Sequence, residues 1–251
     1  MNRQTHNPEA YDLYLRGRYY FNQFAPLATR RSIEYFTRAT EVDQSYALAW
    51  SGLADAYCAS PVSGDTAPLE LLPRAQQAAA NALRSDPNLA EAQTSYAFFQ
   101  LWLGWDWVAA ETAFRKAIVA DSNYAFAPRV LGILLSHLGR HEEARASIRR
   151  ARELDPLSAM NRALSSQIDF AAGDADGAVR YAREAIIIDP EFWIGHLQLA
   201  QAYVELQEYS RALESLTQAS RFSGGNSKTL APRGYRARTS RLRFRLASAR
   251  T

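Results

Sequence analysis

Residues 125–158 read AFAPRVLGILLSHLGRHEEARASIRRARELDPLS, and the spacing within this stretch predicts the fold. Its first half carries apolar residues at helical spacing over 130–138, and Gly139 then ends the predicted helix. A second helix, over about 142–154, ends at Asp155-Pro156, because proline cannot continue a helix. The stretch therefore predicts two helices joined by a turn.

The same layout recurs six times along the chain. Successive units close at positions separated by 43, 35, 34, 34 and 34 residues, and small residues keep fixed places before each closing position. The closing residues are Asp43, Asp86, Asp121, Asp155, Asp189 and Ser223; the small residues are Ala39, Ala82, Ala117, Ala151, Ala185 and Ala219, preceded seven residues earlier by Ser32, Ala75, Ala110, Ala144, Ala178 and Ala212. Small side chains let two helix axes approach closely, and a period in this range indicates stacked helical hairpins.

The composition fits a chain that buries an extended core. Of its 251 residues 47% are hydrophobic, and no apolar run approaches the roughly 20 residues of a membrane span. The first nine residues are polar and lack the apolar segment of a secretory signal. Cys58 is the only cysteine, so no internal disulfide can form, which fits a reducing compartment. We therefore expect a cytoplasmic protein without a membrane span.

Motifs of the common catalytic sites are absent from the sequence. It has no phosphate-binding glycine loop, no HExxH or GxSxG motif and no pair of cysteines. His137 and His141 are four residues apart, but Gly139 between them predicts two different helices rather than one metal-binding face. Asp106, between two tryptophans, is interpreted as a turn residue. We expect no enzyme activity, no cofactor and no metal site.

Charge is distributed unevenly along the chain. Of its 29 basic and 26 acidic residues, 21 and 26 fall in residues 1–222, which therefore carry −5, while the eight basic residues of 223–251 give +8. Three interpretations of this Arg-rich tail remain open: a disordered basic segment, a C-terminus altered by truncation or a shifted reading frame, and an arm that binds anions or nucleic acid. We expect at most weak contact of the tail with polyanions.

At this spacing the units resemble the tetratricopeptide repeat family, whose first helix carries an aromatic, a Leu, a small residue and a Tyr. Unit two matches with Trp50, Leu53, Ala54, Tyr57, Ala75, Ala82 and Pro87, with Ala79 in place of the usual aromatic, and unit six with Leu199, Ala200, Tyr203, Ala212, Leu216 and Ala219. The stretches NPEAYDLYLRGRYYFNQ, YALAWSGLADAY and GWDWVAAETAFRKAI also resemble repeat arrays attached to bacterial winged-helix regulators, class III adenylate cyclases and Ser/Thr kinases.

The resemblance implies an all-α fold, a right-handed α-solenoid of antiparallel helix hairpins with six units and a partial seventh. We expect an N-terminal arm over 1–8, a solenoid over 9–226, and a partial seventh helix with the basic tail over 227–251. A solenoid needs a cover for its last apolar face, and a helix from Ser227 to about Tyr235 offers only part of one. The expected units are about 10–46, 47–89, 90–124, 125–158, 159–192 and 193–226.

Three units are longer than the repeat. Unit one has three extra residues within 21–29, and unit three has one extra around 104–107. Unit two has nine extra within 58–73, where Pro61, Gly64 and Pro68 predict an exposed loop and Pro73 suits the first turn of the next helix. Insertions in a solenoid fall in loops along one rim, which either contacts a partner or has no function of its own.

The resemblance also implies that a concave groove is lined by the second, fifth, ninth, twelfth and thirteenth positions of each first helix. The protein-binding candidates are Tyr14, Arg18, Phe98, Trp102, Phe126, Arg129, Ile133, His137 and Phe170. Aromatic and Arg side chains dominate the energies of many interfaces. The alternative is that Phe98, Phe126 and Phe170 only pack between adjacent first helices. The Lys/Asn/Arg set with which chaperone adaptors of the family bind a C-terminal carboxylate is missing, which disfavours that role.

We therefore expect a non-catalytic scaffold or sensory module of a bacterial signalling system that binds a peptide or protein segment in its groove. The alternative is that the chain is the repeat portion of a larger regulatory enzyme or DNA-binding regulator. A winged-helix, cyclase or kinase domain encoded upstream would favour the alternative.

Overall fold

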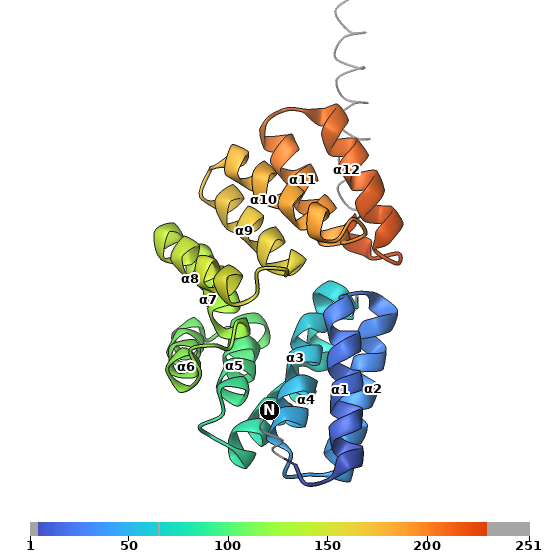
Figure 1. The fold of residues 1–251 in the computed structure, drawn as a ribbon, viewed down its shortest axis with the longest axis vertical. Helices are drawn as coiled ribbons and strands as arrows, with labels where there is room; N and C mark the ends of the chain where they lie inside the picture. The colour runs from blue at the N-terminus through green and yellow to red at the C-terminus, as the bar shows by residue number, and fades with distance from the viewer. Residues whose placement is uncertain (1–4, 65, 230–251) are drawn as a thin grey trace, which may run out of the picture.

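The computed structural model describes residues 5–64 and 66–229, and within them the helices form an all-α solenoid without a strand (Figure 1). Each predicted unit contains one antiparallel hairpin, as the sequence register predicts. The hairpins are α1 (Pro8–Gln23) with α2 (Pro26–Val42), α3 (Ala47–Ser63) with α4 (Pro68–Ser85), α5 (Ala90–Phe99) with α6 (Trp107–Ala120), α7 (Phe126–His137) with α8 (His141–Leu154), α9 (Ala159–Ala171) with α10 (Ala175–Ile188), and α11 (Trp193–Glu205) with α12 (Tyr209–Phe222).

The repeated small residues lie where the hairpins pack. The alanines that precede the closing residues are completely buried in all six units: Ala39, Ala82, Ala117, Ala151, Ala185 and Ala219. The closing Asp then ends the second helix, because its carboxylate accepts a hydrogen bond from the backbone N–H two residues later. This occurs at Asp43, Asp86, Asp121 and Asp189, with N–H to oxygen distances of 2.8–3.0 Å.

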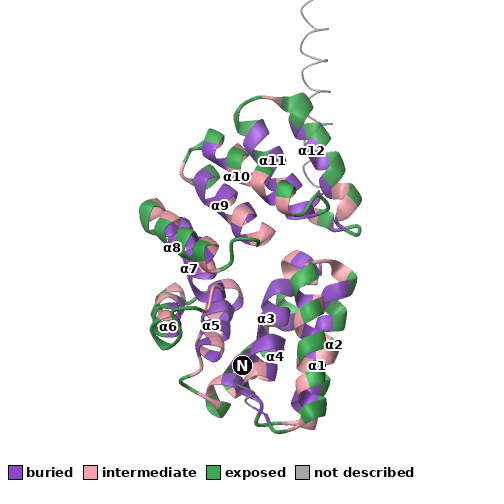
Figure 2. Ribbon diagram, viewed as in Figure 1, coloured by how far each residue is buried: buried purple, intermediate pink, exposed green. Residues whose placement is uncertain are grey.

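Burial follows the same repeat (Figure 2). First helices such as α7 and α11 are buried over most of their length, since α7 contacts helices of the preceding and following units and α11 contacts α9 and α10 as well as its partner α12. Second helices such as α8 bury only a narrow stripe, which is Ala144, Ile148 and Ala151. The first helices therefore form the inner layer of the solenoid and the second helices its outer layer.

The extra residue of unit three widens one helical turn. The turn after α5 is π-helical over Gln100–Gly104 (η1), which is how a helix accommodates one inserted residue. Trp105 follows with a φ of 56°, and the carboxylate of Asp106 accepts a hydrogen bond from the N–H of Ala109 at 2.9 Å. Asp106 is thus the N-cap of α6, which agrees with its interpretation as a turn residue.

The exposed loop predicted within residues 58–73 is wrong. α3 continues through Pro61 to Ser63, and α4 begins at Pro68 with Pro73 inside the helix rather than in its first turn. Proline removes one helical hydrogen bond, but Cys58, Ala59 and Ser60 are buried against neighbouring helices. Packing therefore maintains the helix past the proline, and the connection shrinks to residues 64–67.

Units one and six lie side by side (Figure 1), because the helices follow an arc that brings the start of α11 to the turn between α1 and α2. The partial seventh helix predicted from Ser227 begins as a 3-10 turn, Ser227–Thr229 (η2). The rest of that prediction lies outside the described residues, as do nearly all of the Arg-rich tail and residues 1–4 of the N-terminal arm. Within the described part of the chain, no helix is both long and apolar enough to cross a membrane.

Candidate binding face

Four consecutive first helices bring charged and phenolic side chains to one place on the inner layer. They are Arg18 on α1, Asp55 on α3, Glu91 on α5 and Arg129 on α7, together with Tyr124 of the loop before α7, and we call this set the central cluster. An Nη of Arg18 lies 3.9 Å from a carboxylate oxygen of Asp55. Tyr14, another predicted groove residue, borders the set and is electrostatically coupled to Arg18, Glu91 and Asp55.

The central cluster is poorly solvated, and this shifts its acid–base equilibria. Asp55 is only 1% exposed, and burial raises the pKa of its carboxyl to about 7 despite the opposing effect of Arg18. Burial likewise raises the pKa of Glu91 and lowers that of Arg129 to about 10. Each shift has the sign that desolvation of a charged form produces, so the fold keeps these charges at a cost in stability.

Hydrogen bonding within the central cluster is incomplete. Oδ1 of Asp55 and the hydroxyl of Tyr124 are buried, and neither has a hydrogen-bond partner among the described residues. No carboxylate of the described residues lies within 4 Å of the Arg129 guanidinium, which instead stands over the ring of Phe126 at 4.5 Å. Buried polar groups in proteins are nearly always paired. An acceptor, a hydroxyl and a cation that lie together without such partners therefore mark a candidate binding site.

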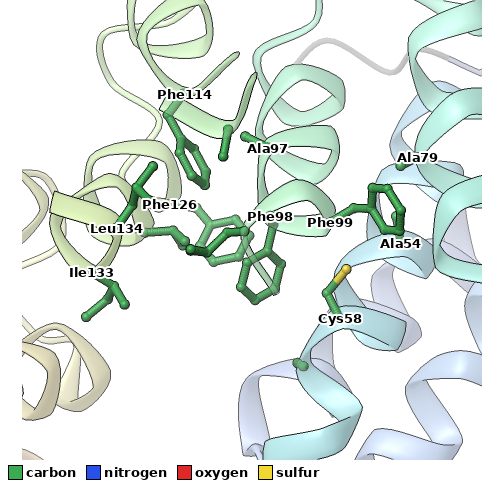
Figure 3. Packing of buried hydrophobic residues seen from close by; sticks show 14 of the residues in the cluster. Ala54, Cys58, Ala79, Ala97, Phe98, Phe99, Phe114, Phe126, Ile133 and Leu134 are labelled. Carbon is green, nitrogen blue, oxygen red and sulfur yellow. The ribbon is translucent and has the colours of Figure 1, made fainter. Parts of the chain in front are cut away.

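Aromatic side chains form the floor beneath the central cluster. The rings of Phe98 and Phe126 meet edge to face at 5.5 Å between α5 and α7 (Figure 3). Phe21 of α1 reaches Phe126 at 6.4 Å. Phe98, Phe126 and Ile133 are 9%, 8% and 4% exposed. These three groove candidates therefore lie in the core and support the face from below, and only Phe170 of the predicted aromatic anchors is exposed, at 37%.

Trp102 and His137, two further candidates, meet at the edge of the face. Their rings are 5.7 Å apart, and the ring of Trp107 packs against His137 at 6.4 Å. Trp105 stacks on Trp107 at 6.2 Å and is 71% exposed. We call Trp102, Trp105, Trp107 and His137 the aromatic rim. The aromatic rim lies around the π-helical turn, which follows α5 and accommodates the extra residue of unit three.

The structure thus divides the nine predicted residues into several groups. Arg18 and Arg129 belong to the central cluster, with Tyr14 beside them; Trp102 and His137 belong to the aromatic rim. The sequence analysis missed Asp55 and Tyr124. Asp55 occupies the ninth position of the unit-two first helix, the same position that gives Arg18 in unit one, so the register itself identifies it. Tyr124 lies in the loop before α7, where the register gives no signal.

Side chains able to ligate metal are dispersed. Within residues 5–64 and 66–229, no group of three or more His, Cys, Asp or Glu residues is placed to hold a metal ion. His137 ends α7 and His141 begins α8, so they lie on different helices as predicted. Cys58 is a free thiol buried in the core, where burial raises its pKa.

Comparison with known families agrees with the repeat read from the sequence and with the hairpins. Two models of the tetratricopeptide repeat match residues 130–156 and 169–226. The chain is a tetratricopeptide repeat protein. A search of the curated proteins gives no significant match.

Solved tetratricopeptide repeat structures share the fold. PilW, a type IV pilus biogenesis factor, is 19% identical with a TM-score of 0.62, over 90% of this chain and 98% of that one. A tetratricopeptide repeat protein of Thermus thermophilus is 16% identical with a TM-score of 0.64, over 78% and 99%. The pilF protein of Pseudomonas aeruginosa is 21% identical with a TM-score of 0.57, over 75% and 81%. At these identities the likeness concerns the fold.

Proposed function

We propose that this protein is a non-catalytic interaction scaffold in the cytoplasm of a bacterium, part of a signalling or regulatory system, and that its inner face binds an extended segment of a partner protein. Membership of the tetratricopeptide repeat family supports the scaffold role. The single reduced thiol of Cys58 suits the compartment. The observation that carries the proposal is the incomplete hydrogen bonding of the central cluster.

An extended peptide has the chemistry that the central cluster lacks. Each of its amide units offers a carbonyl that can accept a hydrogen bond from Arg129. Each also offers an N–H that can donate to the buried Oδ1 of Asp55 once binding moves the side chains that cover this atom. The hydroxyl of Tyr124 can either donate or accept a hydrogen bond. Satisfying buried groups of this kind is worth more than a surface contact, because leaving them unpaired carries the full desolvation penalty.

The aromatic rim lies within reach of the same segment. Arg129 and His137 are eight residues apart on α7, which is about 12 Å along a helix. About four residues of extended chain span that distance. A short segment can therefore place its backbone on the central cluster and an apolar side chain against Trp102 and His137.

Peptide selection tests the central cluster directly. Peptides selected from a random library on the whole protein should bind it and lose at least about tenfold in affinity on Arg129→Ala, the effect of removing about 1.4 kcal/mol. Arg129→Lys should recover little, because lysine is a point charge without the planar donor fork. Arg180→Ala is the matched control, since Arg180 is an exposed arginine on the outer helix α10.

The aromatic rim is tested by a second pair of variants. Trp102→Ala combined with Arg129→Ala should abolish binding measured by fluorescence anisotropy, while the thermal midpoint changes little. If the selected peptides bind this double variant as tightly as the wild type, the site lies elsewhere on the molecule. If Arg180→Ala weakens binding as much as Arg129→Ala does, recognition depends on overall charge and not on the central cluster.

A further inference from the structure

Unit six contacts unit one directly, although 169 residues separate the contacting positions. The indole N–H of Trp193, at the start of α11, donates a hydrogen bond of 2.9 Å to the carbonyl of Phe24. The side chain of Phe24 packs with Met160, Leu197 and Phe222 against a buried cluster that includes Trp193. Met160 and Leu197 belong to the inner helices α9 and α11. Phe24 therefore occupies an apolar part of the inner face of units five and six.

The backbone of Phe24 is in a conformation that phenylalanine rarely adopts. It is the C-cap of α1, with φ 49° and ψ 43°, in the left-handed region that favours glycine. A bulky residue persists there only where its surroundings impose the conformation. The hairpin turns of units three and six hold Trp105 and Gln207 in the same left-handed conformation, so the hairpin turn imposes it. The contact with units five and six packs the side chain that this turn presents.

A second set of contacts joins the loop after α12 to the end of α3. Asn226 is completely buried, and its Nδ2 donates to the carbonyls of Val62 at 2.7 Å and Ser63 at 3.4 Å. The ammonium of Lys228 donates to the carbonyl of Pro61. The last carbonyls of a helix lack partners within it, and its C-terminus attracts cations. Asn226 and Lys228 therefore cap α3 from the far end of the chain.

The two segments of units one and two that contact unit six both lie in insertions of the repeat. Phe24 lies within the stretch 21–29 that holds the three extra residues of unit one, and Pro61–Ser63 lie within the stretch 58–73 that holds the nine extra residues of unit two. The second insertion lengthens α3 until its C-terminus meets the loop over 223–229. A fixed repeat requires neither feature. The insertions that the register leaves unexplained are the parts that contact unit six.

We propose that Phe24, Asn226 and Lys228 form a latch that closes the solenoid on itself, and that opening it uncovers a second recognition surface on units five and six. That surface comprises Trp193, Phe222, Met160 and Leu197, and it fits an aromatic side chain whose own carbonyl is free, as at a turn or the end of a helix. Phe24 is the occupant in the closed chain. The recognition step rests on the proposed function, whereas the closure does not.

The latch is tested by measuring the distance between unit one and unit six. Spin labels at Arg30 on α2 and Gln218 on α12, both exposed, in a Cys58→Ala background, should give one narrow distance distribution by double electron–electron resonance. Phe24→Gly removes the aromatic ring but keeps a residue that tolerates the left-handed turn. It should broaden and lengthen the distribution. Gln207→Gly is the matched control, because Gln207 has a φ of 59° in the turn between α11 and α12, away from the latch.

The double variant Asn226→Ala with Lys228→Ala removes the contacts between the loop after α12 and the end of α3. It tests the closure independently, in case Phe24→Gly has a folding defect. It should also broaden the distribution, and helicity by circular dichroism should be retained in all variants. A distribution that stays narrow in both Phe24→Gly and the double variant overturns the latch. So does an equal broadening in Gln207→Gly.

The recognition surface is tested with N-acetylphenylalaninamide, which carries the aromatic ring and a free amide carbonyl. In the Phe24→Gly variant it should shift the indole ¹H–¹⁵N signal of Trp193 at millimolar concentration, and N-acetylglycinamide should not. The wild type should show at most a small shift, because Phe24 occupies the surface. If the Trp193 signal of the open variant does not shift on addition of the probe, the proposed recognition surface is refuted. Adding Arg129→Ala should leave this response unchanged, which separates it from failure of the central cluster.

Discussion

Replacing Asp55 by Asn is expected to stabilise the protein at pH 8 and to change its stability little at pH 4. The folded state raises the pKa of this carboxyl from its ordinary value of 3.8 to about 7, so folding favours the protonated form. A raised acid pKa means that stability is complete below pH 3.8 and falls as the pH rises through 7. Asn resembles the protonated acid in shape and charge, so the variant gains stability over the wild type only at pH values where Asp55 ionises.

The size of the effect follows from the shift. Each pKa unit corresponds to about 1.4 kcal/mol, so the ionised carboxyl costs the fold about 4 kcal/mol at pH 8. Urea unfolding followed by circular dichroism at pH 5, 6, 7 and 8 measures the difference between variant and wild type. The difference should grow from pH 5 to about pH 7 and level off by pH 8, since the folded and unfolded states bind different numbers of protons only between the two pKa values.

Asp169→Asn is the contrasting control. Asp169 is also buried, but its Oδ1 accepts a hydrogen bond of 2.8 Å from Nε of Arg145. Replacing the charged acceptor of this hydrogen bond should cost about 1–3 kcal/mol, so this variant should be destabilised at neutral pH. If Asp55→Asn also loses stability at pH 8, or gains the same amount at every pH, desolvation of Asp55 is not the dominant effect and the reasoning fails.

Further predictions concern packing and capping, each measured as a change in the free energy of unfolding in urea. A Cβ on Gly52 would lie 2.5 Å from the buried ring of Phe36, so Gly52→Ala should cost about 1–3 kcal/mol, and Phe36→Leu in the same chain should recover part of it. Ala151→Leu, at a completely buried position, should cost about 1–3 kcal/mol by overpacking. Asp106→Ala should cost about 1 kcal/mol, because the N–H of Ala109 loses its cap.

The fold was predictable because every unit repeats the same local contacts. Ala151 is small for the same reason as Ala117 and Ala185, so one register determines the packing at all three. The loop predicted over 58–73 failed because burial of Cys58–Ser60 outweighs the helix-breaking tendency of Pro61, and burial depends on the neighbouring units. Local signals describe a hairpin well, and describe its insertions poorly.

The candidate site was predictable only in part. The register correctly brought Arg18 and Arg129 to one face, but exposure could not be read from it. Phe98 and Phe126 were candidates for open anchors and instead form the floor, because α1 approaches α7 closely enough for Phe21 to contact Phe126. Asp55 affects the charge of the face because its Oδ1 is buried without a hydrogen-bond partner. This burial results from the packing of four helices together, so the sequence of one unit does not reveal it.

Asp55 and Phe24 share a thermodynamic character that bears on function. Each is a residue the fold holds against its own preference, one as a buried carboxylate and the other in a left-handed conformation. Stability alone would favour Asn at the first position, and the left-handed backbone alone would favour Gly at the second. Residues that are costly to keep mark places where activity opposes stability. On that argument Asp55→Asn should yield a more stable protein that binds peptide less well, and a variant improved in both respects would separate Asp55 from recognition.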